Sequence, residues 1–331
     1  MGDFMKNLIK KTFHTFLIAI LMFYILFHAD KAKEFAYVGL ETWFTQLIPS
    51  LLPFMILSSL LIQLDLVSCF CKPFRFFLRP LFQMNDTCLY ILITGFLCGF
   101  PIGAKNIAQL YKEGKLTKFE GEYLLSFCNN IGPVYFMSFV WNNVYPQILF
   151  PYGIAIMFCP PFLYGLFLRY TIYRKKISIS PISSLNYRIL SLEPIKQIHP
   201  QKAFKELSFP DALDISITSS LLQISILGGY MILFNLLVLL PFTLFHTNPF
   251  QSFLHSLIEI SGGLVSLKES NFSNMEKFLL AHLALCFNGL CCMFQTFHLI
   301  KDTDLSGQKY MLHKLILCSI TLFLILFTFL L

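Results

Sequence analysis

The sequence predicts an all-α integral membrane protein: a polytopic helical bundle with an internal, inverted repeat and with re-entrant or broken helices. Three observations predict this fold class. The composition is strongly apolar, long runs contain no charged residue, and two similar halves are both interrupted by glycine or proline within apolar runs. The order of these runs along the chain predicts the individual elements.

The composition excludes a water-soluble fold. Of the 331 residues, 56% are hydrophobic and 13% are charged, whereas about 25% of residues are charged in a typical soluble domain. A single water-facing globule of this length cannot bury so much apolar surface. The formal net charge of +7 comes from Lys and Arg dispersed between apolar runs. A nucleic-acid partner is therefore not expected, because it would need one basic patch with stacking aromatics.

Charge-free runs predict the membrane-spanning helices, because a span needs about 20 residues with few charges. Such runs cover 12–28 and 42–64, two spans within 123–168, and further spans within 215–258, 278–300 and 315–331. The run 88–104 is also free of charge, but it is short and contains Gly95, Gly99, Pro101 and Gly103. A straight helix through it is not expected.

Lysines and arginines between the spans predict the orientation, because they concentrate in cytoplasmic loops. The segment 169–205 contains eight Lys or Arg against one acid, so it should be cytoplasmic, together with Lys6 near the N-terminus. If 88–104 crossed the membrane fully, Lys112 and the lysines around it would lie outside. A re-entrant hairpin keeps them inside, and we predict that path.

Two sequence matches in the same order predict the internal repeat. Ser50–Ser59 aligns with Ser220–Gly229, and Cys98–Thr117 aligns with Phe287–Ser306. On the predicted path the two copies cross the membrane in opposite directions, as in many secondary transporters whose broken helices meet at the midplane. Chance similarity between leucine-rich segments is the alternative. The predicted domains are an N-terminal transmembrane helix at 1–34, a first repeat at 35–170, a cytoplasmic basic linker at 171–210 and a second repeat at 211–331.

The interruption at Gly99–Asn106 is the first candidate binding site, because irregular backbone at membrane depth is tolerated only where it is buried in protein or lines a cavity. Lys105 would cost about 3 kcal/mol or more at a helix centre, so it either reaches the interface or pairs with an anion. At Asn129–Pro133, two amides precede a Gly-Pro kink; they can bind a solute or bond between helices. The first-copy candidates for substrate binding are Gly99, Phe100, Pro101, Gly103, Lys105, Asn106, Asn129, Asn130, Gly132 and Pro133.

The second copy adds four candidates. Asn288, Gly289 and Gln295 occupy the positions that align with the first interruption. Glu259 precedes a Ser-Gly-Gly sequence and is the only acid between Asp214 and Glu269. It is interpreted as a candidate site for a coupling ion or proton, with an interfacial carboxylate as the alternative.

Sequence motifs for catalysis and for metal binding are absent. There is no P-loop, no nucleophile elbow and no pair of carboxylates in a span, so neither a catalytic residue nor an ATP-driven pump is expected. The 10 cysteines lie mostly within apolar runs, without a C-x-x-C motif or histidines at metal-ligand spacing. Neither a metal nor any other cofactor is expected, and the cysteines are interpreted as small apolar side chains.

The segment CGFPIGAKNIAQLYKEGKLTKFEGEYLLSFCNNIGP, at 98–133, resembles the YlbJ-type sporulation integral membrane proteins of the nucleoside-recognition, or gate-domain, superfamily. Its Gly-aromatic-Pro-x-Gly-Ala-Lys string and its Cys-Asn-Asn followed by Gly-Pro carry the resemblance. The second half is similar more loosely, through Leu257–Gly263 and Asp304–Ser306. Where the family has Gly-Gly-Leu-Ser-Val-His-x-Gln, this chain has Asn-Gly-Leu-Cys-Cys-Met-Phe-Gln at 288–295.

The resemblance implies a multi-pass protein of a bacterial cell membrane, in the outer forespore membrane if the host forms spores. It implies transport of dipicolinic acid, a flat aromatic dianion for which Lys105, helix N-termini and Phe100 would be suitable partners. A carrier of nucleosides or other small solutes is the first alternative, and a non-transporting scaffold of a sporulation complex is the second. The expected partners are the small-molecule substrate and the lipid bilayer. The sequence is compatible with a homo-oligomer as well as with a monomer.

Overall fold

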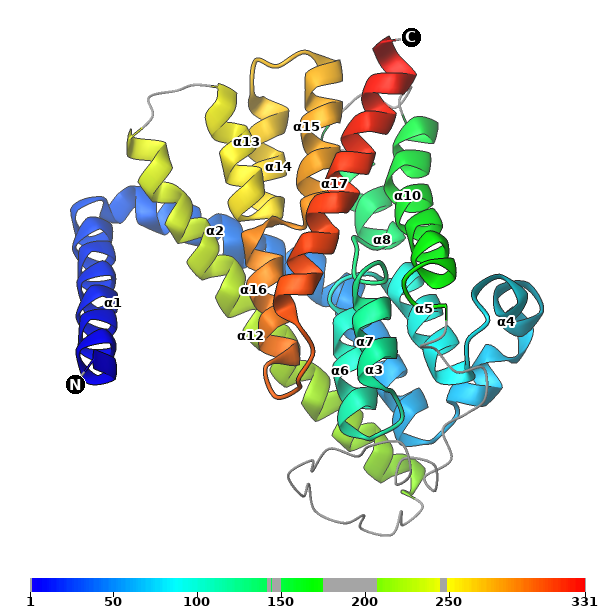
Figure 1. Ribbon diagram of the computed structural model, residues 1–331. Helices are drawn as coiled ribbons and strands as arrows, with labels where there is room; N and C mark the ends of the chain where they lie inside the picture. The colour runs from blue at the N-terminus through cyan, green and yellow to red at the C-terminus, as the bar shows by residue number, and fades with distance from the viewer. Residues whose placement is uncertain (1, 142–143, 145–149, 175–206, 245–248, 331) are drawn as a thin grey trace.

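The computed structural model describes residues 2–141, 144, 150–174, 207–244 and 249–330, and every regular element in these ranges is a helix (Figure 1). The predicted all-α fold is confirmed. Within the described residues, six helical segments are long and apolar enough to cross a membrane: 9–27, 29–63, 151–170, 209–240, 274–300 and 307–328. A seventh would be the pair α4 (Val67–Phe82) and α5 (Asp86–Cys98), which is bent by 99°.

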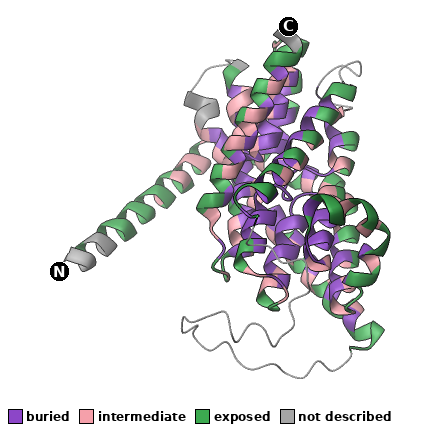
Figure 2. Cartoon of the chain, turned by 45° about the vertical axis from the view of Figure 1, so that its right-hand side comes forward, coloured by how far each residue is buried: buried purple, intermediate pink, exposed green. Residues whose placement is uncertain are grey.

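The first half of the chain begins with two long segments. Helix α1 (Gly2–Phe27) projects from the bundle and is largely exposed, so lipid would surround it (Figure 2). The next span comprises α2 (Ala29–Thr42), the π-helical turn η1 (Trp43–Leu47) and α3 (Ile48–Gln63). Helix α4 follows, and its basic and aromatic residues make it strongly amphipathic.

A hairpin, a broken helix and a further span complete the first half. Helices α5 and α6 (Ile102–Lys112) run antiparallel, since the Asn106 amide donates to Thr94 Oγ1 across the pair (3.0 Å). The broken helix comprises α7 (Lys118–Leu125), then α8 (Pro133–Tyr135) and η2 (Phe136–Val140). Helix α10 (Phe150–Tyr170) is the following span.

Apart from α1 and α4, the described second half has the same order of elements. Helix α12 (Phe209–Leu244) precedes an antiparallel hairpin of α13 (Pro249–Ile258) and α14 (Ile260–Glu269), in which His255 Nδ1 bonds Ser266 Oγ across the pair (2.8 Å). A broken helix follows, made of α15 (Asn274–Phe287) and α16 (Gly289–Ile300), and then α17 (Gly307–Leu330).

The two broken helices also start in the same way. A capping box, in which a hydroxyl and a glutamate satisfy each other's backbone N–H groups, opens α7 with Thr117 and Glu120. Another opens α15 with Ser273 and Glu276. Element order therefore pairs the turn at Gly99 with the turn at Glu259, and the break near Asn129 with the break at Asn288. The sequence alignment differed, since it paired the segment beginning at Cys98 with the one beginning at Phe287.

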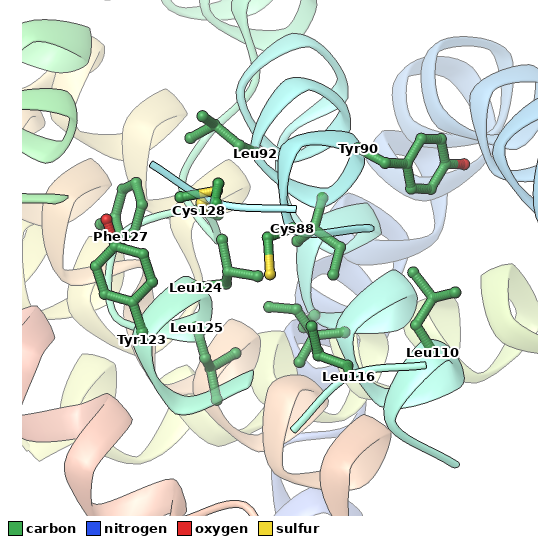
Figure 3. Packing of buried hydrophobic residues seen from close by; sticks show 14 of the residues in the cluster. Cys88, Tyr90, Leu92, Leu110, Leu116, Tyr123, Leu124, Leu125, Phe127 and Cys128 are labelled. Carbon is green, nitrogen blue, oxygen red and sulfur yellow. The ribbon is translucent and has the colours of Figure 1, made fainter. Parts of the chain in front are cut away.

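The main apolar core holds the first hairpin against the first broken helix. Figure 3 shows Cys88 and Leu92 of α5 facing Leu124 and Cys128, with Leu110 and Leu116 closing the cluster. All six side chains are at most 1% exposed. The absence of side chains at Gly95 and Gly103 permits this packing, because a Cβ on either would approach the Cys128 carbonyl oxygen to 2.4 Å.

The two ends of the bundle differ. The connections 113–117 and 301–306 lie side by side at one end, where Lys112 pairs with Asp302 (3.1 Å) and Lys118 with Asp304 (3.0 Å) (Figure 1). We call this the Lys112 end. Helix α12 starts there, whereas the α14–α15 connection lies at the opposite end (Figure 1). The first hairpin thus enters and leaves the bundle at the Lys112 end, as the re-entrant path predicts, while most of the basic linker lies outside the described residues.

Candidate functional site

The turn of the first hairpin is fixed by backbone contacts to the first broken helix. Gly99 has φ of +75°, a conformation that glycine adopts without strain. The next residue, Phe100, donates its backbone N–H to the Asn130 carbonyl (2.6 Å). A Cβ on Gly99 would approach the Gly132 nitrogen to 2.2 Å, so the turn and the break are in direct contact.

The turn of the second hairpin is capped by a buried carboxylate. Glu259 is 2% exposed and is the N-cap of α14: its carboxylate accepts from the backbone N–H groups of Ser261 (3.1 Å) and Gly262 (2.7 Å). Asn235 on α12 donates its amide to the same carboxylate (3.1 Å). The oxygen of that amide accepts from His255 Nε2 (3.3 Å). These contacts fix the carboxylate at the tip of the hairpin.

Both turns and both breaks contribute to one small space of about 50 Å³, which we call the central cavity. Helices α3 and α12 complete its wall. The lining residues are Leu47, Leu51, Cys98, Phe100, Ile131, Gly132, Tyr135, Met231, Glu259, Ile260, Ser261, Cys291, Cys292 and Gln295. The two halves of the chain therefore meet at this cavity.

The lining is mainly apolar with a few polar groups, as in many sites for small molecules. Besides Glu259, these are Tyr135 and Ser261, whose hydroxyls bond each other (3.0 Å), and Gln295, whose amide donates to the Leu227 carbonyl (3.3 Å). Phe100 presents an aromatic side chain from the first hairpin. The cavity can accordingly offer stacking, amide and hydroxyl contacts.

The two breaks are joined by a buried polar cluster behind the cavity. Asn129 donates its amide to Thr296 Oγ1 (3.1 Å) and Tyr310 Oη (3.2 Å). Asn288 donates to the Asn129 carbonyl (2.9 Å), while its own Oδ1 is buried without a hydrogen-bond partner. Since buried amides are normally paired, this oxygen is an unused acceptor.

Two lysines are buried in the bundle without a carboxylate. Lys105 is 3% exposed and donates to the Met55 carbonyl and to Ser220 Oγ, both at 3.2 Å. Lys314 is fully buried and donates to the Asn129 carbonyl (2.8 Å) and to Asn130 Oδ1 (2.6 Å). Neither ammonium belongs to an ion pair among the residues that the structure describes. Both therefore contribute positive potential to the interior.

A second space of about 310 Å³ extends from the centre to the Lys112 end, and we call it the vestibule. Gln295 lines both the vestibule and the central cavity. The outer charged lining is Lys112, Lys301 and Asp302, with His298 between. The remaining vestibule residues are Met55, Pro101, Leu222, Gln223, Ile226, Leu227, Tyr230 and Leu299.

The structure divides the predicted site residues into three groups. Phe100, Gly132, Gln295 and Glu259 line the central cavity, and Pro101 lines the vestibule. The second group is buried in contacts behind the cavity and consists of Lys105, Asn106, Asn129, Asn130 and Asn288. The third group shapes the backbone and consists of Gly99, Gly103, Pro133 and Gly289. Asn106 Oδ1 is another buried acceptor without a partner.

Sequence reasoning missed Lys314 and the cavity-lining Tyr135 and Ser261. The charge-free run beginning at Leu315 placed Lys314 just outside the predicted span, whereas α17 begins at Gly307 and carries Lys314 into the bundle. An earlier helix start would have revealed a lysine within a span. In the described part of the chain, no group of three His, Cys, Asp or Glu side chains could hold a metal ion.

Residues 44–143 match the family model described as nucleoside recognition (Gate). The matched range includes the first hairpin and the first broken helix. The chain is also 24% identical to the sporulation integral membrane protein YlbJ of Bacillus subtilis (strain 168), over 94% of this chain and 80% of that protein. The resemblance expected from the sequence is confirmed. No solved structure matches the chain.

Proposed function

We propose that the protein is a membrane carrier for a small organic anion, with its solute site at the central cavity. The observation that carries this proposal is the pair of buried ammonium groups, Lys105 and Lys314, which bond only neutral oxygens near a cavity built by both halves of the chain. An anion loses a hydration shell worth several kcal/mol per charge on entering such a site, so fixed positive potential is what it requires.

Both lysines lie close to cavity-lining backbone. Met55, the acceptor of Lys105, is one helical turn from Leu51 in the cavity wall. Asn130, the acceptor of Lys314, directly precedes Ile131 of the lining. Helix α6 also begins at the first hairpin turn, and its dipole favours negative charge there. The N-terminus of α14 is already capped by the Glu259 carboxylate.

The vestibule supports an approach of anions from the Lys112 end. Its charged lining holds two lysines and one aspartate, with the aspartate paired to Lys112. The charge of Lys301 is therefore not balanced by this aspartate, and the vestibule that leads to Gln295 carries a net positive charge. The vestibule, at about 310 Å³, falls within the range of about 300–1,000 Å³ typical of small-molecule sites.

The central cavity, at about 50 Å³, is smaller than that range. A solute of this class therefore needs more room than the described conformation offers, and it would enter when the hairpin turns at Gly99 and Glu259 separate. Such a change fits the alternating access of transporters built from paired repeats.

Dipicolinate is the proposed solute, and the outer forespore membrane the proposed location. The similar protein YlbJ of Bacillus subtilis is named a sporulation integral membrane protein. Dipicolinate is a flat aromatic dianion, for which Phe100 offers a stacking surface and the buried lysines offer positive potential. This combination favours it over neutral solutes.

A nucleoside carrier is the second candidate, favoured by one specific observation. Glu259 and Gln295 both line the cavity, and a carboxylate with an amide can bind ribose hydroxyls and a base edge. The family model that matches residues 44–143 is itself described as nucleoside recognition.

Uptake into liposomes containing the purified protein distinguishes these candidates. Labelled dipicolinate should accumulate above the level of protein-free liposomes, and excess unlabelled dipicolinate, but not uridine or adenosine, should reduce the uptake. Transport of nucleosides alone would favour the second candidate. If a folded preparation moves neither solute, the carrier proposal fails and a scaffold role in a sporulation complex becomes the better explanation.

A further inference from the structure

Two half-helices point their C-terminal ends at the same place. Helix α7 runs from the Lys112 end to the middle of the bundle, and α15 runs to the middle from the opposite end (Figure 1). The segments after them are joined where the Asn288 amide donates to the Asn129 carbonyl (2.9 Å). Because the C-terminus of a helix carries partial negative charge, two negative dipole ends meet here.

Such an arrangement is a cation site in many transporters, where unwound carbonyls and half-helix C-termini bind the coupling sodium ion or proton. In this protein the side chain of Lys314, a residue of α17, lies at the junction of the two broken helices. Its Nζ is 2.8 Å from the Asn129 carbonyl oxygen and 2.6 Å from Asn130 Oδ1, and the side chain is fully buried. The ammonium bonds only neutral oxygens and lies 5.7 Å from the centroid of the Tyr310 ring. Helix dipoles and the face of this ring, rather than a partner carboxylate, therefore stabilise its charge.

A second observation indicates that this place is built for a cation. Asn288 Oδ1 is buried and has no hydrogen-bond partner, although the nitrogen of the same amide bonds the carbonyl that accepts from Lys314. The cluster therefore contains one more oxygen acceptor than its donors use. Tyr310 Oη and Thr296 Oγ1 add further oxygens through their bonds to Asn129.

We propose that Lys314 is a tethered cation that fills a monovalent-cation site at the junction of the two broken helices, so that no sodium ion binds there. The site itself follows from the contacts of Lys314 alone. Its consequence for coupling, that solute movement does not use a sodium gradient, rests on the proposed carrier function.

Thermal unfolding of the purified protein tests the site independently of transport. Midpoints are compared in sodium chloride, methylammonium chloride and choline chloride at equal ionic strength, for the wild type, Lys314→Ala and Lys105→Ala. We expect the wild type to show no difference between the salts. Lys314→Ala should lose stability in choline and regain several degrees with sodium or methylammonium, because a free cation stabilises the folded state to which it binds.

Lys105→Ala is the matched control, since it also removes a buried ammonium but leaves acceptors on the regular helices α3 and α12. Its midpoint should not respond to the cation. Specific stabilisation of the wild type by sodium, no response of Lys314→Ala, or an equal response of both variants would overturn the proposal. If Lys314→Ala cannot be purified without sodium, its recovery becomes the readout: folded protein with either small cation supports the proposal, and failure in every salt overturns it.

The coupling consequence is measured separately. Uptake of dipicolinate by the wild type should be equal, within twofold, whether sodium or choline is the external cation. Uptake that rises tenfold with inward sodium would overturn the coupling inference. Absence of uptake in both media, together with the expected unfolding data, would reject the carrier function and leave the Lys314 site supported.

Discussion

Gly99 and Gly132 are in direct backbone contact at the point where the first hairpin turn meets the first break. A Cβ on Gly99 would lie 2.2 Å from the Gly132 nitrogen, and one on Gly132 would lie 2.5 Å from the Cys98 carbonyl oxygen. The close contact lets both residues line or border the central cavity. It also makes the cavity sensitive to a single methyl group.

Gly99→Ala should destabilise the protein by about 3 kcal/mol or more, because the added methyl group meets rigid backbone and the residue also has positive φ. Gly114→Ala is the matched control: Gly114 has φ of +70° but has no atom within 4 Å of the added Cβ. This substitution should cost about 1 kcal/mol from its backbone conformation alone. Thermal midpoints in detergent measure both, and equal losses would show that the backbone contact is not tight.

Lys105→Met should reduce uptake of the anion at least about tenfold, because it removes buried positive charge while keeping side-chain length. Lys105→Arg should retain part of the activity, since the charge stays although the geometry changes. Ser220→Ala is the control, because it removes one of the two acceptors and leaves the ammonium bonded to the Met55 carbonyl. Initial rates are compared at matched protein content in the membrane. Unchanged uptake by Lys105→Met would assign Lys105 a purely structural role between α3 and α12.

The fold was predictable from apolar runs and from the residues that interrupt them. Gly99 and Pro101 indicated a broken segment because neither residue suits a helix interior, and the lysines around Lys112 indicated a hairpin because they could not lie outside. The correct pairing of the two halves was not predictable from local similarity. It depends on which helices fold back on themselves, and only long-range contacts such as His255 to Ser266 reveal that.

The candidate site was predictable only in part, for a similar reason. Phe100, Gly132 and Glu259 lie at chain interruptions, and interruptions at membrane depth have to line a cavity or be buried. Gln295 lies within α16, about two turns after the interruption at Asn288. Tyr135 lies just beyond an interruption in an apolar run, where sequence gives no sign of the face it presents. For Asn129 and Asn130 the sequence left solute binding and bonding between helices open. In the structure the Asn129 amide bonds Thr296 and Tyr310, and Asn130 Oδ1 accepts from Lys314. The Asn288 amide bonds the Asn129 carbonyl.

Asp302→Asn should change how stability depends on pH. The hydrogen bond and the positive charge from Lys112 lower the pKa of the Asp302 carboxyl below its usual value of 3.8. Since the folded-state pKa is the lower one, the contribution of the pair is fully present above pH 3.8 and is lost as pH falls through the lowered pKa. Thermal midpoints of wild type and variant should therefore differ at pH 6 and converge on acidification. The difference should be small because the pair is exposed, and high salt should reduce it.

Lys112→Cys should be labelled by an impermeant thiol reagent from the same side of the membrane as Arg174→Cys. The first hairpin returns to the end at which it enters, so Lys112 lies beside Asp302 and on the side where α12 begins (Figure 1). Because basic residues concentrate in cytoplasmic loops, that side should be the cytoplasm.

Asn271→Cys is the control for the opposite side, since Asn271 is exposed in the α14–α15 connection at the other end of the bundle. The measurement uses a background without the 10 native cysteines, in intact and permeabilised cells. Labelling of Lys112→Cys and Asn271→Cys from one and the same side would contradict the re-entrant hairpin and, with it, the opposed orientation of the two halves.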